Sequence, residues 1–292
     1  MNKYCGSEVI IMACSSCNIS CDHCYISYTG NRSPSELFEI ATTLKDKYDI
    51  NINGAEILTN LEYLKTLSLI GQPFFMSNGK KIYDNPEVLE ILKENGITSV
   101  SLSYHFGIQN DISPITPEQT EKTLKLIMAN GLQTRLLTTI TSKNYNRVLE
   151  MCNKAKELGV RGIKFTNFLQ QGKALDLPSE NILSEKQKLE FFKLLIQARE
   201  IYDVDELLIE RCGSFGVNPF DQNNNFNCTA INDSVVLAPD NNIYPCVFLA
   251  KPGYEIGKYI DGNIILDTYY QNNGQECIAD NICNGKTKKF LL

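Results

Sequence analysis

The sequence predicts an α/β fold, in which a partial, TIM-like (β/α)6 barrel precedes a small C-terminal β-hairpin domain. Short apolar segments alternate with amphipathic ones up to about residue 200, the pattern of parallel strands joined by helices. Six such units occur, fewer than the eight that close a full barrel. Beyond residue 205 the chain becomes rich in Asn, Cys and turn residues. We therefore expect a barrel domain over residues 1–204 and a second domain over residues 205–292.

Each predicted element rests on apolar periodicity and on local start or stop signals. Ser33-Pro34 is a good cap and first turn for the first helix, and Asn130-Gly131 is a typical helix end. Asp240-Asn241 lies between two short apolar segments, 234–238 and 242–245, which predicts a hairpin. The expected strands are 8–13, 50–57, 73–77, 98–103, 134–140 and 162–168, and the expected helices are 35–48, 86–94, 117–129, 145–158 and 185–201.

Composition narrows the functional classes. The 292 residues are 43% hydrophobic, enough for a large core, and the net charge of −6 argues against a nucleic-acid partner. Without an 18-residue apolar run or a signal peptide, we expect no membrane partner and a cytoplasmic location. Eleven cysteines in a cytoplasmic chain indicate metal binding rather than disulfides. Five lie in the first 24 residues and five in the last 81, which predicts two metal regions.

Three cysteines directly after the first strand, Cys17, Cys21 and Cys24, have the spacing C-x3-C-x2-C. A [4Fe–4S] cube normally has four Cys ligands, so three thiolates leave one iron open. The motif resembles the signature of the radical S-adenosylmethionine (SAM) superfamily. That resemblance implies a [4Fe–4S] cluster whose open iron binds SAM and cleaves it reductively to a 5′-deoxyadenosyl radical. The alternative is a zinc site, which would need a fourth ligand such as His23.

Two further segments resemble SAM-binding motifs of this superfamily. Asn53-Gly54-Ala55-Glu56 resembles Gly-Gly-Glu-Pro, which implies that Gly54 approaches SAM closely and that Glu56 accepts from its amino group. Asn replaces the first Gly, and Ile57 replaces Pro. Ser77-Asn78-Gly79 resembles Thr-Asn-Gly, whose side chains meet the ribose.

The remaining contacts with SAM are implied by the later strands and by the cluster motif. Ser101 and Ser103 resemble the run near the SAM carboxylate, but no Arg follows before Gln133, so Arg135 is the nearest substitute. Phe168 and Leu169 belong to a run that resembles the one lying against adenine. Tyr25 matches the aromatic residue that often follows the last cluster cysteine. His105, just beyond Ser103, is expected to touch substrate. The alternatives for these residues are ordinary turns and barrel core.

The C-terminal cysteines resemble the SPASM/twitch extension, in which Gly-x4-Cys often ends in Tyr-Pro-Cys; here Asn241 replaces that Gly. The full SPASM extension has about seven cysteines and two clusters, whereas this segment has five, so we expect one auxiliary [4Fe–4S] cluster. Cys212 is then a substitute ligand, an inert buried thiol or a hydrogen-atom donor. A zinc site is the alternative for the whole set. The expected ligands are Cys228, Cys246, Cys277 and Cys283.

These resemblances imply a radical SAM enzyme that abstracts a hydrogen atom from a ribosomally made peptide, leading to epimerisation or cross-linking. Flavodoxin or ferredoxin is the expected electron donor. Because the motif begins at residue 17, we expect substrate recognition by the barrel, the C-terminal segment or a separate protein. One alternative is a radical SAM enzyme acting on a small-molecule cofactor or nucleotide precursor, although the six scattered Arg residues favour a peptide. The other alternative is a non-catalytic metal scaffold.

Overall fold

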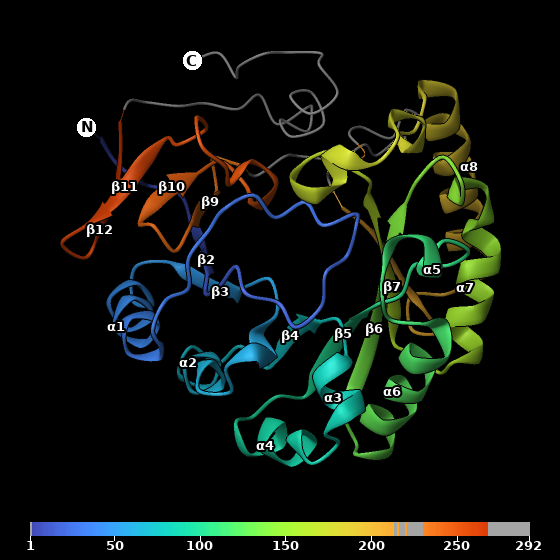
Figure 1. The fold of residues 1–292 in the computed structure, drawn as a ribbon, viewed down its shortest axis with the longest axis horizontal. Helices are drawn as coiled ribbons and strands as arrows, with labels where there is room; N and C mark the ends of the chain where they lie inside the picture. Colours follow the sequence, from blue (N-terminus) through green and yellow to red (C-terminus); the bar gives the residue numbers. More distant parts are fainter. Residues whose placement is uncertain (1, 213–214, 216–219, 221–229, 268–292) are drawn as a thin grey trace.

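The computed structural model describes residues 2–212, 215, 220 and 230–267, and its central strands follow the predicted order. Helices alternate with the strands and lie outside them (Figure 1). Each strand overlaps its predicted range, so the α/β fold class is confirmed. These strands are β2 (Glu8–Met12), β3 (Asp49–Asn53), β4 (Phe74–Ser77), β5 (Ser99–Ser103), β6 (Gln133–Ile140) and β7 (Gly162–Asn167).

The parallel strands are divided between two sheets. One sheet has the order β4-β5-β6-β7-β8 and is parallel throughout. Its last strand, β8 (Leu208–Arg211), is too short and too polar to stand out in the sequence. In the other sheet β2 and β3 are parallel. Among the described strands no backbone ladder joins β3 and β4, but the Gln72 side chain bonds to both, at Ile52 and at Phe74.

The helices begin where the capping signals predict. Ser33 accepts a hydrogen bond from the Glu36 amide at the start of α1, and Thr116 and Ser184 form capping boxes at α6 and α8. The short helices α2, α3 and α5 were not predicted, because they are too short to show helical periodicity. The helices are α1 (Pro34–Leu44), α2 (Tyr63–Leu69), α3 (Lys80–Asp84), α4 (Val88–Glu94), α5 (Gln109–Ile112), α6 (Pro117–Ala129), α7 (Val148–Glu157) and α8 (Glu185–Ile201).

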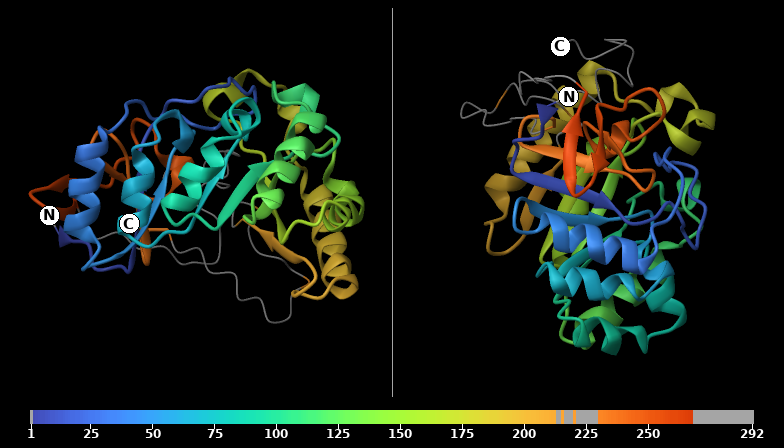
Figure 2. Two further views of the ribbon diagram at one scale, coloured as in Figure 1. Left: turned by 90° about the horizontal axis from the view of Figure 1, so that it is seen from below. Right: turned by 90° about the vertical axis from the view of Figure 1, so that its left-hand side faces the viewer.

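The predicted C-terminal hairpin is confirmed and joins the barrel directly. β9 (Ser234–Leu237) pairs antiparallel with β10 (Asn242–Tyr244) and parallel with β2. The sheet order is β1-β12-β11-β10-β9-β2-β3. In both views of Figure 2 the N-terminus lies beside the red strands, as the pairing of β1 with β12 requires. The remaining strands are β1 (Asn2–Lys3), β11 (Gly257–Ile260) and β12 (Asn263–Leu266).

A buried arginine fixes the hairpin to the barrel a second time. The Arg32 side chain is fully buried, and it donates hydrogen bonds to Glu36 (2.6 Å), to Asn241 Oδ1 (2.8 Å) and to the Ala238 carbonyl. Asn241 has a φ of 64°, in the left-handed region that Asn tolerates in turns. Asn241 therefore accepts a side-chain hydrogen bond from Arg32. The Gly of the SPASM/twitch motif has no side chain and could not accept it.

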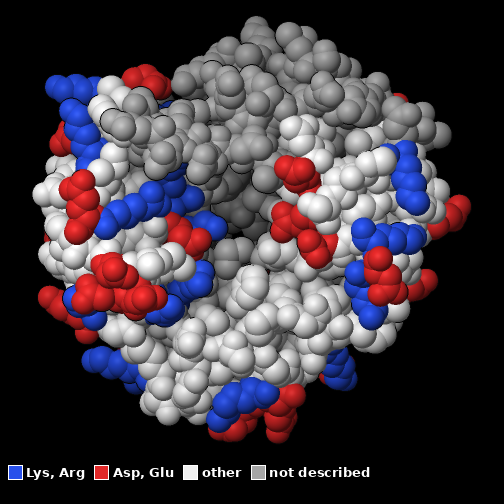
Figure 3. All heavy atoms as spheres, turned by 180° about the vertical axis from the view of Figure 1, so that it is seen from behind, with Lys and Arg blue, Asp and Glu red and all other residues white. Residues whose placement is uncertain are grey.

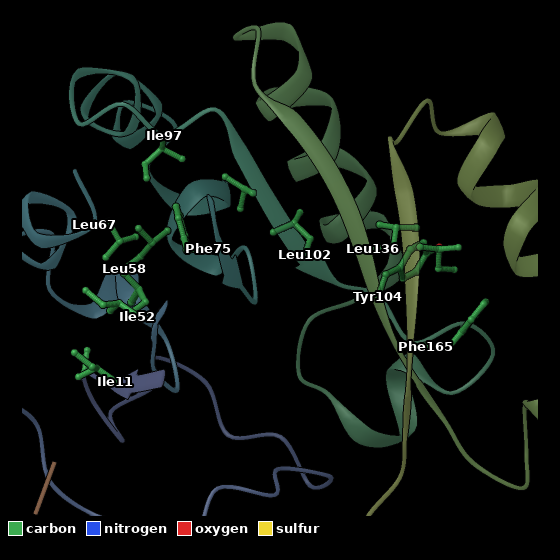
Figure 4. Packing of buried hydrophobic residues seen from close by; sticks show 14 of the residues in the cluster. Ile11, Ile52, Leu58, Leu67, Phe75, Ile97, Leu102, Tyr104, Leu136 and Phe165 are labelled. Atoms are coloured by element: carbon green, nitrogen blue, oxygen red, sulfur yellow. The ribbon is translucent and has the colours of Figure 1, made fainter. Parts of the chain in front are cut away.

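The two faces of the parallel sheet differ in polarity. Leu102 and Leu136 are fully buried on the face that packs against the helices (Figure 4), and Val100 shares that face by the alternation of β5. Ser101, Ser103 and Arg135 alternate with them and point to the other face, toward the barrel interior. Seen from behind, the molecule is hollowed near its centre, with charged side chains beside the hollow (Figure 3). No helix of the described chain is long and apolar enough to cross a membrane.

Candidate active site

The cysteine motif lies on a long loop, residues 13–32, that runs from β2 to α1 across the ends of the strands (Figure 1). We call this segment the cluster loop. Its two ends are tied together, because Asn31 Oδ1 accepts from the amides of both Ser15 and Ser16, each at 3.1 Å. The Arg32 amide also donates to the Ala13 carbonyl at 2.9 Å. The cysteines are therefore presented at the carboxyl ends of the strands, where barrel enzymes place their reactive groups.

The three thiols of the motif approach one another on this loop. Cys17 is exposed, and Cys21 and Cys24 are half-buried. Burial raises the pKa of Cys21 to about 11, and the neighbouring thiols of Cys17 and Cys24 add to that rise. Thiols crowded in this way lose their protons readily only beside a cation, which a metal cluster supplies.

Cys17, Cys21 and Cys24 supply three thiols on one loop, which is the donor type that an iron–sulfur cube takes. In the described part of the chain, no group of three or more His, Cys, Asp or Glu side chains is close enough to hold one metal ion. In a cube each thiolate binds a different iron, so its ligands stand farther apart than those of a single zinc ion.

Glu56 is completely buried just beyond β3, and its carboxylate is hydrogen-bonded to other groups of the protein. Its carboxylate accepts from Ser77 Oγ (3.0 and 3.1 Å), from the Asn78 amide (2.8 Å) and from the Leu58 amide (3.2 Å). Burial raises its pKa to about 7, against the opposite effect of these donors. In this arrangement Glu56 holds the end of β4 in place rather than facing open space.

Gly54 and Asn78 make close contacts around the first cysteines. A Cβ added at Gly54 would lie 2.8 Å from the Cys14 sulfur, so the position has room only for glycine. Asn78 Nδ2 donates to the Cys17 sulfur at 3.4 Å and to Asn18 Oδ1 at 2.8 Å. Asn78 is thus the predicted SAM-site residue that touches the cluster loop directly, and its neighbour Ser77 is occupied by Glu56.

Arg135 lies apart from the cluster loop. It is paired with Ser101 across β5 and β6, whereas Ser103 is paired with Leu137, two residues or about 6–7 Å farther along the strand. Arg135 also forms an ion pair with Glu210 at 3.2 Å. Ser103 lines a small cavity together with Cys21 and Asn78. Ser103 therefore lies beside the cluster loop. Ser101 lies two residues earlier on β5, farther from the loop, and Arg135 pairs with Glu210.

Tyr25 connects the cluster loop with the C-terminal cysteines. Its ring packs on Phe248 with the centroids 4.8 Å apart. Burial raises its pKa, and the thiols of Cys24, Cys212 and Cys246 raise it further, which places all three near the phenol. Cys212 directly follows β8, so it too is at the carboxyl end of a strand. The other predicted ligands, Cys228, Cys277 and Cys283, lie outside the described residues.

The segment after β7 packs against the last cluster cysteine. Gly172 has a φ of +60°, and an added Cβ would lie 2.6 Å from the Cys24 carbonyl oxygen. The Lys173 amide donates to that same carbonyl at 2.9 Å, and its ammonium donates to Ser20 Oγ at 2.7 Å. Phe168 and Leu169, the predicted adenine contacts, are 2% and 3% exposed. Lys173 was not among the predicted site residues, although the glycine before it is a signal of close backbone approach.

A larger cavity lies outside this site. It measures about 490 Å³ and is lined by side chains of the β5–α6 connection and of α7, among them Tyr104, Phe106 and Arg147. The predicted cluster and SAM residues do not line it. The candidate site is therefore defined by the cluster loop rather than by cavity size.

Comparison with known proteins supports the predicted resemblance. The chain is 23% identical over 271 residues to the antilisterial bacteriocin subtilosin biosynthesis protein AlbA of Bacillus subtilis (strain 168). The match covers 87% of this chain and 56% of AlbA. No protein-family model matches the chain.

Solved structures share the fold at low sequence identity. Streptococcus suis SuiB bound to S-adenosylmethionine aligns with a TM-score of 0.65 at 15% identity, covering 95% of this chain and 65% of SuiB. SuiB bound to its precursor peptide SuiA aligns with a TM-score of 0.62 at 16% identity, covering 95% and 64%. Native anSMEcpe with bound AdoMet aligns with a TM-score of 0.64 at 19% identity, covering 86% and 77%. The chain thus has the fold of SuiB and anSMEcpe, and it spans 56–65% of the length of AlbA and SuiB.

Proposed function

We propose that this chain is a radical SAM enzyme that abstracts a hydrogen atom from a peptide substrate. The observation that carries the proposal is the three-thiol cluster loop, fixed across the carboxyl ends of the parallel strands. The similarity to AlbA, a bacteriocin biosynthesis protein, and the fold shared with SuiB bound to a precursor peptide both favour a peptide over a small molecule.

The residues of the cluster loop and those at the strand ends have different roles at this site. Cys17, Cys21 and Cys24 would hold a [4Fe–4S] cluster, which with SAM bound supplies the 5′-deoxyadenosyl radical. Asn78, which donates to the Cys17 sulfur, and Ser103, which lines a cavity with Cys21, would orient SAM beside the cluster, with Ser101 farther inside the barrel. Glu56 holds Ser77 and Asn78 in position, so its effect on SAM binding is exerted through the end of β4.

The other SAM contacts are proposed from the resemblance. Gly54 keeps the β3 end close to Cys14, and Tyr25 closes the cluster loop against Phe248. Phe168 and Leu169 supply the apolar surface for adenine. Arg135 would reach the SAM carboxylate only after leaving Glu210, so we assign it the role of supporting the barrel interior.

We further propose that the part of the predicted range 205–292 beyond β8 forms a twitch-like domain with one auxiliary [4Fe–4S] cluster, held by Cys228, Cys246, Cys277 and Cys283; β8 itself pairs with β7 in the barrel sheet. Cys212 is then available to return a hydrogen atom to a substrate radical. Its position directly after β8 and near Tyr25 supports that role. After donating the atom, the sulfur would need one electron, from an electron donor such as flavodoxin or ferredoxin, and one proton, from the solvent.

The decisive experiment is anaerobic reconstitution with iron and sulfide, followed by dithionite and SAM. The wild type should bind about eight irons and form 5′-deoxyadenosine. The triple variant Cys17→Ala/Cys21→Ala/Cys24→Ala should keep about four irons and form none. Cys152→Ala, which changes a buried helix thiol far along the chain, is the matched control and should behave as the wild type. A wild type that binds zinc, takes up no iron and forms no 5′-deoxyadenosine would instead be a metal scaffold.

A second experiment identifies the type of peptide modification. The enzyme is incubated with a candidate precursor peptide in D2O, and the mass of the product peptide is measured. Epimerisation would add one deuterium at the inverted carbon, because the thiol of Cys212 exchanges with solvent. Cross-linking would remove two hydrogens and add no deuterium. Cys212→Ala should abolish epimerisation while 5′-deoxyadenosine is still formed; unchanged epimerisation would exclude Cys212 as the donor.

A further inference from the structure

The two histidines of the chain meet beside the cluster loop. His23 lies within the cysteine motif and His105 follows β5, and their rings form an edge contact with the centroids 4.5 Å apart and the planes at 73°. His105 is 4% exposed. Neither residue belongs to the proposed cluster ligands, so their pairing calls for its own explanation.

Hydrogen bonds fix a different tautomer in each ring. His23 Nδ1 lies 3.0 Å from the Ile112 carbonyl oxygen, which can only accept, so Nδ1 carries the proton. His105 Nδ1 accepts from the Thr139 amide at 3.1 Å, so its proton is on Nε2. Among the described residues no carboxylate bonds to either ring, so each ring carries a single proton. His23 Nε2 is therefore an acceptor and His105 Nε2 a donor.

Both rings line a cavity of about 40 Å³ together with Cys21, Asn78 and Ser103. None of the residues that line it is Asp, Glu, Lys or Arg. Within the described chain the two Nε2 atoms and the Ser103 hydroxyl have no hydrogen-bond partner. The cavity thus offers one fixed acceptor, one fixed donor and one hydroxyl.

The geometry points to a neutral hydrogen-bonding subsite, in which His23 accepts from and His105 donates to one hydroxyl or amide group of a bound ligand. Anionic groups are disfavoured there, because no Lys or Arg lines the cavity and the cluster ligand Cys21 does. The volume admits about two to three waters, which suits the polar end of a ligand rather than a whole nucleotide. A ribose hydroxyl of SAM and a backbone amide of the peptide both have this chemistry. The subsite rests on the proposed function, which brings those ligands to the cluster loop.

Paired substitutions separate ligand binding from a structural role. In His105→Asn the side-chain oxygen still accepts from Thr139, as Nδ1 does, but the donor at the Nε2 position is lost. In His105→Gln the amide reaches the Nε2 position and keeps that donor, while the bond from Thr139 is lost. The probes are SAM and N-methylacetamide, and each is tested on iron-loaded protein. For the probe that occupies the subsite, His105→Asn should weaken binding about five- to tenfold, because one neutral hydrogen bond contributes about that much to affinity. His105→Gln should bind nearly as the wild type.

The chain has two histidines, so ¹⁵N-histidine labelling gives ring signals that report this subsite directly. Oxidised, iron-loaded protein should show one ring protonated on Nδ1 and the other on Nε2. A shift of the Nε2 signals with SAM alone assigns the subsite to the ribose. A shift only after N-methylacetamide is added to the SAM complex assigns it to a peptide amide. Identical tautomers, Nε2 signals that respond to neither probe, or equal losses in both His105 variants would overturn the proposal. Formation of 5′-deoxyadenosine by the same preparation distinguishes that failure from failure of the proposed function.

Discussion

The hydrogen bond between Arg32 and Asn241 joins the end of the cluster loop to the β9–β10 turn, and Asn241→Gly removes it with little change to the backbone. Asn241 has a φ of 64°, which glycine adopts freely. The Arg32 side chain has no exposed surface and donates to Asn241 Oδ1 at 2.8 Å. The substitution therefore takes one acceptor from a buried cation that keeps Glu36 and the Ala238 carbonyl.

The expected loss of stability follows from three terms. A hydrogen bond to a charged group contributes about 1.5–3 kcal/mol. Relief of left-handed strain favours glycine by up to about 1 kcal/mol, and the greater freedom of glycine in the unfolded chain costs about 0.4–1 kcal/mol, so these two nearly cancel. The net loss is about 2 kcal/mol in the free energy of unfolding. For 292 residues, with an unfolding entropy of about 2.1 cal/mol/K per residue, that lowers Tm by about 3 °C.

Calorimetry on iron-loaded protein, with iron content matched between variants, measures this change. Asn241→Asp is the matched control, because it keeps an acceptor oxygen and adds a charge complementary to Arg32. It should unfold at or above the temperature of the wild type. The reasoning is refuted if Asn241→Gly lies within about 0.5 kcal/mol of the wild type, the usual range for a surface substitution. It is also refuted if Asn241→Asp is destabilised as much as the glycine variant.

Two further predictions concern the cluster loop and Glu56. Gly172→Ala should lower iron binding, because its Cβ would press against the carbonyl of Cys24 at 2.6 Å; Gly71→Ala, with a similar φ of +67° and no atom within 4 Å, should suffer the same backbone strain but keep its iron. Equal iron contents in the two variants would contradict that expectation. Glu56 has a pKa of about 7 in the folded chain, above its value near 4.5 when unfolded, so the folded state binds more protons between these values. Its contribution should make the free energy of unfolding fall by about 3 kcal/mol as the pH rises from 4.5 to 7, and Glu56→Gln should flatten that slope in urea titrations across this range. An unchanged slope in the variant would mean that Glu56 titrates near its ordinary value.

The fold was predictable because its signals are local. Ser33, Thr116 and Ser184 are good caps, and each begins a helix where the sequence predicts one. The buried strands alternate with these helices, so their order followed from the apolar segments alone. β8 escaped prediction because its four residues include Glu210 and Arg211, and its place is set by pairing with β7. The parallel pairing of β9 with β2 spans most of the chain and has no local sequence signal.

The site was predictable where one short motif carries it and unpredictable where distant residues meet. The spacing of Cys17, Cys21 and Cys24 indicates a cluster without any knowledge of the fold. By contrast, the contact of Glu56 with Ser77 joins two strand ends, and the sequence assigned each of these residues separately to SAM. The contact of His23 with His105 likewise depends on the course of the β5–α6 connection. Such contacts follow from the arrangement of the strands rather than from residue type.

Each cysteine of the motif is held by a different part of the barrel. Cys17 accepts from Asn78 at the end of β4, and the Cys21 thiol lies 3.8 Å from the hydroxyl of Ser113, beyond α5. The Cys24 carbonyl accepts from Lys173, beyond β7. A loop of this length without such supports would sample many thiol spacings, at a cost in conformational entropy when the cluster binds. Because three separate strand connections fix the three cysteines, the barrel rather than the motif alone sets the geometry that the proposed cluster requires. A change at any one connection should therefore disturb one cluster ligand first, and leave the other two in place.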